Sequence, residues 1–254
     1  MTAPYRLQDA TGSRWYRDTA PDGAVLWRPG TTSVIAMLAK GEGFEQWLVN
    51  NAHRAEQLRK DSASNGTILH QACEALLNGR RVCTTGLDAT DVKRLTNFVR
   101  FCEMARLETL ATERFFLCPD PAPWGYAGTF DVRVRFGKTV TDCHGAVIEQ
   151  GEEAIIDLKS GKGPYPEQFM QISAYCFGTR TPVGVLFFLR ERGLGLHRVE
   201  VEKWWLGFIA CHELFCLTHV QPVVPPPLPT HIEPPDLTEI SITEATMPQG
   251  CKHP

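Results

Sequence analysis

The 254-residue sequence lacks several patterns that would assign it to a particular class of protein. None of its nine cysteines forms a C-x-x-C pair, and Cys102, Cys176 and Cys211 stand inside apolar runs. Such cysteines are typical of reduced thiols used as small core residues. No stretch reaches the roughly 18 consecutive apolar residues of a membrane span, and the first residues contain no apolar signal-peptide core. We therefore expect a cytoplasmic protein without a membrane partner.

An excess of charge of one sign is also missing over most of the chain. The formal net charge is -3, and the only charged residues after position 230 are four acids and Lys252. Of the 26 basic and 29 acidic residues, 25 of each therefore lie before residue 231. A neutral body cannot attract nucleic acid through a global field, so any nucleic-acid site must depend on a local patch.

Two familiar chemical motifs are absent as well. The segment SGKG (160–163) does not have the G-x-x-x-x-G-K-[ST] spacing of a phosphate-binding loop, so we do not expect nucleotide hydrolysis. One predicted helix carries Cys211, His212, Cys216 and His219, but this spacing matches no usual zinc pattern. We expect these four side chains to pack in the core.

Hydrophobic periodicity predicts helices over residues 45–60, 65–79, 88–110, 166–178 and 203–220. It predicts strands over residues 113–118, 126–136, 153–159, 183–190 and 196–202. This order favours a mixed α/β domain over residues 1–220, in which helices cover a central sheet. Residues 221–254 contain nine of the 18 prolines and several acids, which predicts a disordered tail.

The segment AIIDLKSGKG (154–163) contains the most informative pair of charged residues. An apolar strand, Ala154–Ile156, leads into Asp157 and Lys159. Alternate strand residues point to the same side, so the acid and the lysine share one face. Upstream, Asp131 begins an alternating strand in YAGTFDVRV. If the two strands are neighbours, Asp131 and Asp157 meet and require a cation, for which carboxylate oxygens favour Mg²⁺ or Mn²⁺.

These residues form a recognisable series along the chain. G-x-x-D (128–131) is followed by D-x-K (157–159) and then by Q-x-x-x-Y (171–175) on the next predicted helix. The series resembles the PD-(D/E)XK nuclease superfamily, most closely its RecB-type exonuclease branch, over residues 65–178. That branch also carries a helix histidine, which corresponds to His70. A weaker similarity to phage and mitochondrial-genome-maintenance exonucleases extends back to residues 31–38.

The resemblance implies a restriction-endonuclease-like core, with the motif-bearing part over residues 65–202. It implies a metal-dependent DNA exonuclease that serves DNA repair, recombination or phage DNA processing in a bacterium or phage. The metal ligands would be Asp131, Asp157, His70 and the Leu158 carbonyl, and Lys159 would act on the attacking water. RecB-type enzymes with an iron–sulfur cluster use four clustered cysteines, which this chain lacks, so we expect no cluster.

The resemblance also suggests residues that would support the site or contact DNA. Gln171 and Tyr175, four residues apart on one helix face, would brace the site or touch the DNA backbone. Lys162 would contact substrate, and Glu113 stands where relatives often have an acid. Further candidates for contact with DNA are basic residues of the N-terminal half: Arg54, Arg59, Lys60, Arg80, Arg81, Lys93, Arg94 and Arg100.

Simpler interpretations of the same residues stay open at this stage. Asp157 and Lys159 could form an edge-strand ion pair, Asp131 could cap a turn, and Tyr175 could be a core residue. His70 could be a packed or solvated histidine. At the level of function, the alternatives are a non-catalytic module that binds DNA or a protein partner, and an endonuclease that uses the same site. The proline-rich tail could dock a recombination or replication protein in any of these cases.

Overall fold

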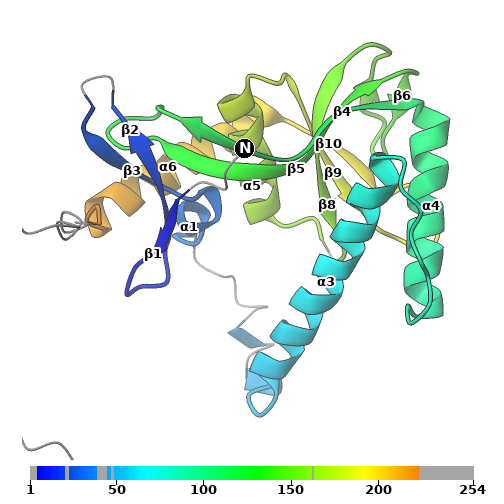
Figure 1. The fold of residues 1–254 in the computed structure, drawn as a ribbon, viewed down its shortest axis with the longest axis horizontal. Coiled ribbons are helices and arrows are strands. Elements are labelled where there is room, and N and C mark those ends of the chain that lie inside the picture. Colours follow the sequence, from blue (N-terminus) through cyan, green and yellow to red (C-terminus); the bar gives the residue numbers. More distant parts are fainter. Residues whose placement is uncertain (1–4, 21–22, 39–44, 47–48, 162, 223–254) are drawn as a thin grey trace, which may run out of the picture. The chain divides into compact units, whose positions relative to one another are not determined.

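A five-stranded sheet organises the molecule (Figure 1). The computed structural model describes residues 5–20, 23–38, 45–46, 49–161 and 163–222. The sheet has the order β10-β9-β8-β5-β4, formed by β4 (Leu107–Cys118), β5 (Tyr126–Phe136), β8 (Glu153–Lys159), β9 (Val183–Phe188) and β10 (Leu196–Val199). Only β8 and β9 pair in parallel, and the other three pairs are antiparallel. The expected mixed α/β core, a central mixed sheet flanked by helices, is thereby confirmed.

Two pairs of helices cover the two faces of this sheet. On one face, α3 (Ala55–Leu77) and α4 (Ala89–Ala105) contribute Leu69 and Phe98 to a core with Val132 and Phe187. On the other face, Ile172 of α5 (Pro166–Thr179) packs with the sheet, and α6 (Val201–Thr218) contacts α5. Each large apolar side chain buried in these layers stabilises the fold by about 1.5–3 kcal/mol. A strand buried on both faces reads as a continuous apolar run, and Ala154–Ile156 of β8 is such a run.

A smaller sheet precedes the main one. It contains β1 (Arg6–Gln8), β2 (Arg14–Thr19) and β3 (Val25–Pro29) in antiparallel order, followed by the short α1 (Thr31–Ile35). Trp15 and Trp27 are buried in a second apolar cluster with Phe208 and Phe215 of α6. A short hairpin with strands of two residues each, β6 (Val140–Thr141) and β7 (Val147–Ile148), follows β5 and precedes β8 in the sequence.

Several boundaries differ from the sequence prediction. Asn65 and Gly66 do not open a helix but lie within α3, because tertiary packing overrides the low helix propensity of glycine. The helix predicted to reach residue 110 ends at Ala105, where Arg106 takes a left-handed conformation and β4 begins. The strands β1 and β2 were not predicted, because the surrounding turn residues obscure them.

The predicted domain and the predicted tail after it can be compared with the structure to different extents. Residues Met1–Pro222 form one unit by internal contacts. Of the tail predicted over residues 221–254, residues 223–254 lie outside the described part of the chain. Among the helices of the described part of the chain, none combines the length and apolar character needed to cross a membrane.

Candidate active site

The two central aspartates lie where the pairing of β5 with β8 ends. Val132 pairs with Ile156, and Asp131 and Asp157 are the next residues on their antiparallel strands. The Leu158 amide donates its hydrogen bond to Asp131 Oδ2 at 2.7 Å. The aspartate side chain thus satisfies a strand amide, which brings the Asp131 carboxylate against β8.

A chain of polar contacts runs from Asp157 to α5. Lys159 Nζ lies 2.5 Å from Asp157 Oδ2 and donates to Gln171 Oε1 at 2.9 Å. Gln171 Nε2 in turn donates to the Tyr175 hydroxyl at 2.7 Å. Asp157 is 2% exposed and Tyr175 is 4% exposed, so these polar contacts are largely shielded from water. The pair is therefore not an ion pair on the surface of an edge strand, and the lysine is held from two sides.

The glycine before the first motif aspartate allows a close approach. A Cβ on Gly128 would lie 2.8 Å from Thr31 Oγ1 and 2.9 Å from Phe116 Cε1. Thr31, at the start of α1, donates its hydroxyl to the Ala127 carbonyl at 2.9 Å. The glycine thus lets α1 pack directly on the strand that carries Asp131.

Helix α3 supplies the histidine. His70 Nδ1 lies 3.6 Å from Asp131 Oδ2. One turn earlier, a Cβ on Gly66 would lie only 3.1 Å from Ser160 Oγ, so the glycine lets α3 approach the segment that follows Lys159. This approach brings the His70 side of the helix to the ends of β5 and β8.

Strand β4 contributes an acid in an unusual conformation. Glu113 lies between two paired positions, Thr112 with Val132 and Arg114 with Phe130, and is therefore opposite Asp131. Its φ is +46°, in the left-handed region that a non-glycine residue within a strand rarely adopts. Such a conformation costs on the order of 1–3 kcal/mol and tends to occur at functional sites.

These groups surround one open pocket of about 690 Å³. Its walls include the sequence-predicted residues His70, Glu113, Asp131, Leu158 and Lys159. They also include Glu74, which the sequence analysis missed and which follows His70 by one helical turn. The remaining lining residues are Gly66, Thr67, Gln71, Ser160 and Gly161. Asp157, Gln171 and Tyr175 are not among the lining residues, and polar contacts join them to the lining through Lys159.

The pocket brings together carboxylates that are partly removed from water. Burial, followed by the neighbouring charge of Asp157, raises the pKa of Asp131 well above its usual range. Burial, together with Glu74 and Asp157, raises the pKa of Glu113. Burial lowers the pKa of His70, which favours the neutral imidazole that a metal requires.

The donor set fits a divalent cation. Carboxylate oxygens and one imidazole are ligands of Mg²⁺ and Mn²⁺, and a positive ion would relieve the repulsion that raises the Asp131 pKa. The donors do not form a closed coordination site. Among the described residues, no three side chains of this pocket have their ligand atoms all within 4.8 Å of one another. An open pocket leaves room for water and a phosphate as additional ligands.

Several of the basic residues predicted to contact DNA lie next to acidic residues. Arg80 lies 3.9 Å from Glu74, Lys93 Nζ lies 3.5 Å from Glu191, and Arg94 lies 3.0 Å from Asp91. This is a surface of mixed charge rather than a basic patch. Lys162 and the side chains of Arg59 and Lys60 lie outside the described residues.

One of the four α6 residues expected to pack in the core, His212, contacts a backbone carbonyl. His212 is fully buried in α6, and its Nε2 lies 2.8 Å from the Gly125 carbonyl oxygen. Cys211 is buried beside it in the cluster that contains Trp15.

Comparison with known proteins identifies no close relative. No family model matches the chain, and no curated protein matches it. Among solved structures, the chain is similar to an alkaline exonuclease, LHK-Exo from Laribacter hongkongensis, with 12% identity, 74% of this chain and 88% of that chain covered, and a TM-score of 0.31. It is also similar to a protein titled SSO0001, with 14% identity, coverage of 75% and 76%, and a TM-score of 0.38. Similarity at this level leaves the function to be argued from the pocket itself.

Proposed function

We propose that the chain is a metal-dependent DNA nuclease, an exonuclease that hydrolyses phosphodiester bonds in DNA repair, recombination or phage DNA processing. One observation carries the proposal. Asp131 and Lys159 line the same open pocket, and Asp157 contacts Lys159. An acid pair that needs a cation, next to a fixed lysine, is suited to the hydrolysis of a phosphate ester.

The residues that would hold Mg²⁺ or Mn²⁺ are Asp131 and Asp157, with His70 and the Leu158 carbonyl as further ligands. When bound, such an ion polarises the phosphate and lowers the pKa of a coordinated water. Glu113 and Glu74 add negative charge that increases the attraction for the cation. The raised pKa of Asp131 also means that this carboxylate gains from a bound cation more than an ordinary surface aspartate does.

Lys159 is the group of this chain that would act on the reacting phosphate. Its contact with Asp157 holds the amine in place, so that it can donate hydrogen bonds to water and to the phosphate oxygens on which negative charge develops. Gln171 fixes the direction of the amine, and Tyr175 fixes Gln171. These contacts favour the bracing role of Gln171 and Tyr175 over contact with the DNA backbone.

The products should follow from simple hydrolysis. A water oxygen forms the new bond to phosphorus, the bond from phosphorus to the leaving sugar oxygen breaks, and the water proton ends on that oxygen or in solvent.

The test is to incubate the protein with end-labelled linear duplex and covalently closed circular DNA, with Mg²⁺, Mn²⁺ or EDTA. We expect loss of the linear substrate only, with either metal, and no cleavage in EDTA. Cleavage of the closed circle would establish an endonuclease that uses the same pocket. Retention of both substrates under every metal, while DNA is still bound, would overturn the nuclease proposal in favour of a binding module.

A further inference from the structure

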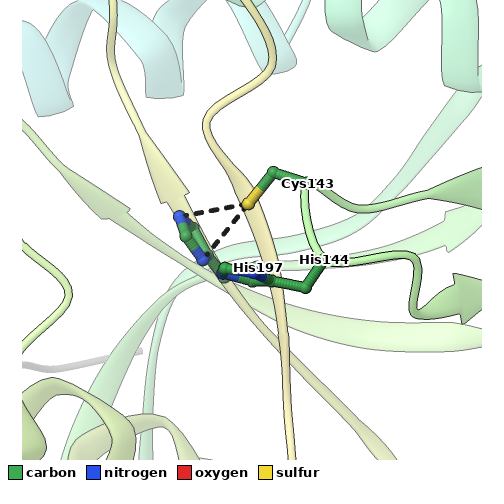
Figure 2. Close-up of side chains that lie close together, drawn as sticks. All are labelled: Cys143, His144 and His197. Atoms are coloured by element: carbon green, nitrogen blue, oxygen red, sulfur yellow. Dashed lines mark hydrogen bonds between the residues drawn. The ribbon is translucent and has the colours of Figure 1, made fainter.

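A second group of ionisable side chains lies at the edge strand of the large sheet. The turn between β6 and β7 brings Cys143 and His144 to His197 of β10, as Figure 2 shows. Cys143 Sγ lies 3.5 Å from His197 Nδ1 and 3.7 Å from Nε2, and the two imidazole rings are 5.1 Å apart. One ligand atom from each of the three residues lies within 4.8 Å of the others.

Hydrogen bonds hold this turn in place. Asp142 Oδ1 accepts from the amides of His144 and Ala146 at 2.8 and 2.9 Å, and Oδ2 accepts from the Arg198 amide at 2.9 Å. Gly145 completes the turn with a φ of +89°, which a residue with a side chain adopts only with strain. The buried Asp142 carboxylate therefore ties the turn to β10, next to His197. The three side chains converge because the backbone between them is fixed.

We propose that Cys143, His144 and His197 bind a Zn²⁺ ion. A thiolate and two imidazoles are the donors that zinc prefers, whereas Mg²⁺ prefers oxygen. At bond lengths of about 2.0–2.3 Å, tetrahedral ligands lie roughly 3.3–3.6 Å from one another, so only small rotations of these side chains are required. Cys143 and His144 are exposed, which leaves a fourth position for water.

The site would join two segments that are 53 residues apart in the sequence. Strand β10 is an edge of the sheet, and the β6–β7 turn packs against it. A metal ion shared between them would fasten the turn and protect the edge. A simpler thiol–imidazole contact explains the approach of Cys143 to His197, and the His197 ring also packs on Phe188 at 5.3 Å. That contact does not explain why His144 joins the pair.

The first test is metal analysis of the tag-free full-length protein. After equilibration with Zn²⁺ and removal of free metal, we expect one zinc ion per chain. The Asp131→Asn variant should bind the same amount of zinc. Cys143→Ser and His197→Gln should weaken zinc binding by more than about 100-fold in competition with a chromophoric chelator. Cys83→Ser, which alters another exposed cysteine, is the matched control and should bind zinc like the wild type.

Substitution by Co²⁺ keeps the test decisive even if a variant folds poorly. The wild-type protein loaded with one Co²⁺ should show a thiolate-to-cobalt charge-transfer band and intense visible bands of tetrahedral cobalt. Absence of these bands, or equal zinc affinity in Cys143→Ser and Cys83→Ser, would overturn the proposal. Neither readout depends on DNA cleavage, so the zinc site and the proposed nuclease activity can fail separately.

Discussion

Two carboxylates of this molecule, the buried Asp142 and the partly buried Asp131, have opposite surroundings. Asp142 accepts three backbone hydrogen bonds, which outweigh the effect of burial and hold its pKa below the usual range. Asp131 accepts one backbone hydrogen bond, and removal from water, followed by the charge of Asp157, raises its pKa. The first carboxylate is fully satisfied by the fold, whereas the second is left needing positive charge.

The difference separates a structural acid from a candidate functional one. A fold gains stability when buried charge is hydrogen-bonded, so an acid that remains poorly compensated is a candidate for binding something else. The strained conformation of Glu113 lies at the same pocket as Asp131. Comparison of the two aspartates therefore gives a direct way to test where function resides.

The largest expected effect follows removal of charge from the pocket. Asp131→Asn should reduce the rate of Mg²⁺-dependent DNA cleavage by roughly 10²–10⁴-fold, because a metal ligand is lost while a hydrogen-bond acceptor for Leu158 is kept. The measurement is the initial rate of nucleotide release from linear duplex DNA. An activity within threefold of the wild type would remove Asp131 from the site.

The corresponding change at the turn should affect stability instead. Asp142→Ala leaves three backbone amides without their acceptor and should lower the free energy of unfolding by about 2–4 kcal/mol. Chemical denaturation followed by circular dichroism measures this change. Cleavage per folded molecule should stay at the wild-type level, and a selective loss of cleavage would contradict the division between the two acids.

A difference in pH dependence follows from the raised pKa of Asp131. Its contribution to stability is present below the unfolded pKa of about 3.9 and is lost as pH rises through the folded pKa. In EDTA, the melting temperature of the wild type should therefore fall relative to Asp131→Asn as pH rises from 5 to 9. Mg²⁺ should offset that fall, since it binds the ionised carboxylate. A constant difference between the melting temperatures of the two proteins at every pH would show that the pKa of Asp131 is not raised in the folded state.

The smallest effect should come from the far end of the polar chain. Tyr175→Phe removes the acceptor for Gln171 Nε2 but leaves Lys159 in contact with Asp157. A neutral hydrogen bond contributes about 0.5–1.5 kcal/mol, so we expect a loss of cleavage rate of roughly 2- to 10-fold. A loss as large as that of Asp131→Asn would assign Tyr175 a direct part in the reaction.

The sequence predicted those features that depend on local pattern. Strand alternation placed Asp157 and Lys159 on one face, and the predicted strands brought Asp131 to Asp157. Glu74 was missed, because its position depends on how α3 packs against β4 and β5 of the sheet. No propensity indicates the left-handed backbone of Glu113.

The Cys143–His197 contact was also beyond prediction from the sequence. It joins residues that are 54 positions apart in the sequence, and only the tertiary fold brings them together. The adjacent Cys143 and His144 alone match no usual zinc spacing. The position of Glu74 and the Cys143–His197 contact both depend on tertiary geometry, which the secondary-structure prediction does not contain.

The most direct test of the nuclease pocket compares two lysine substitutions. Lys159→Ala removes the amine held by Asp157 and Gln171, whereas Lys138→Ala removes an exposed lysine of a surface turn. Both variants are assayed for Mg²⁺-dependent degradation of end-labelled linear duplex DNA, with folding verified by circular dichroism. We expect a loss of roughly 10²–10⁴-fold for Lys159→Ala and full activity for Lys138→Ala. Equal activity of the two folded variants would contradict this expectation.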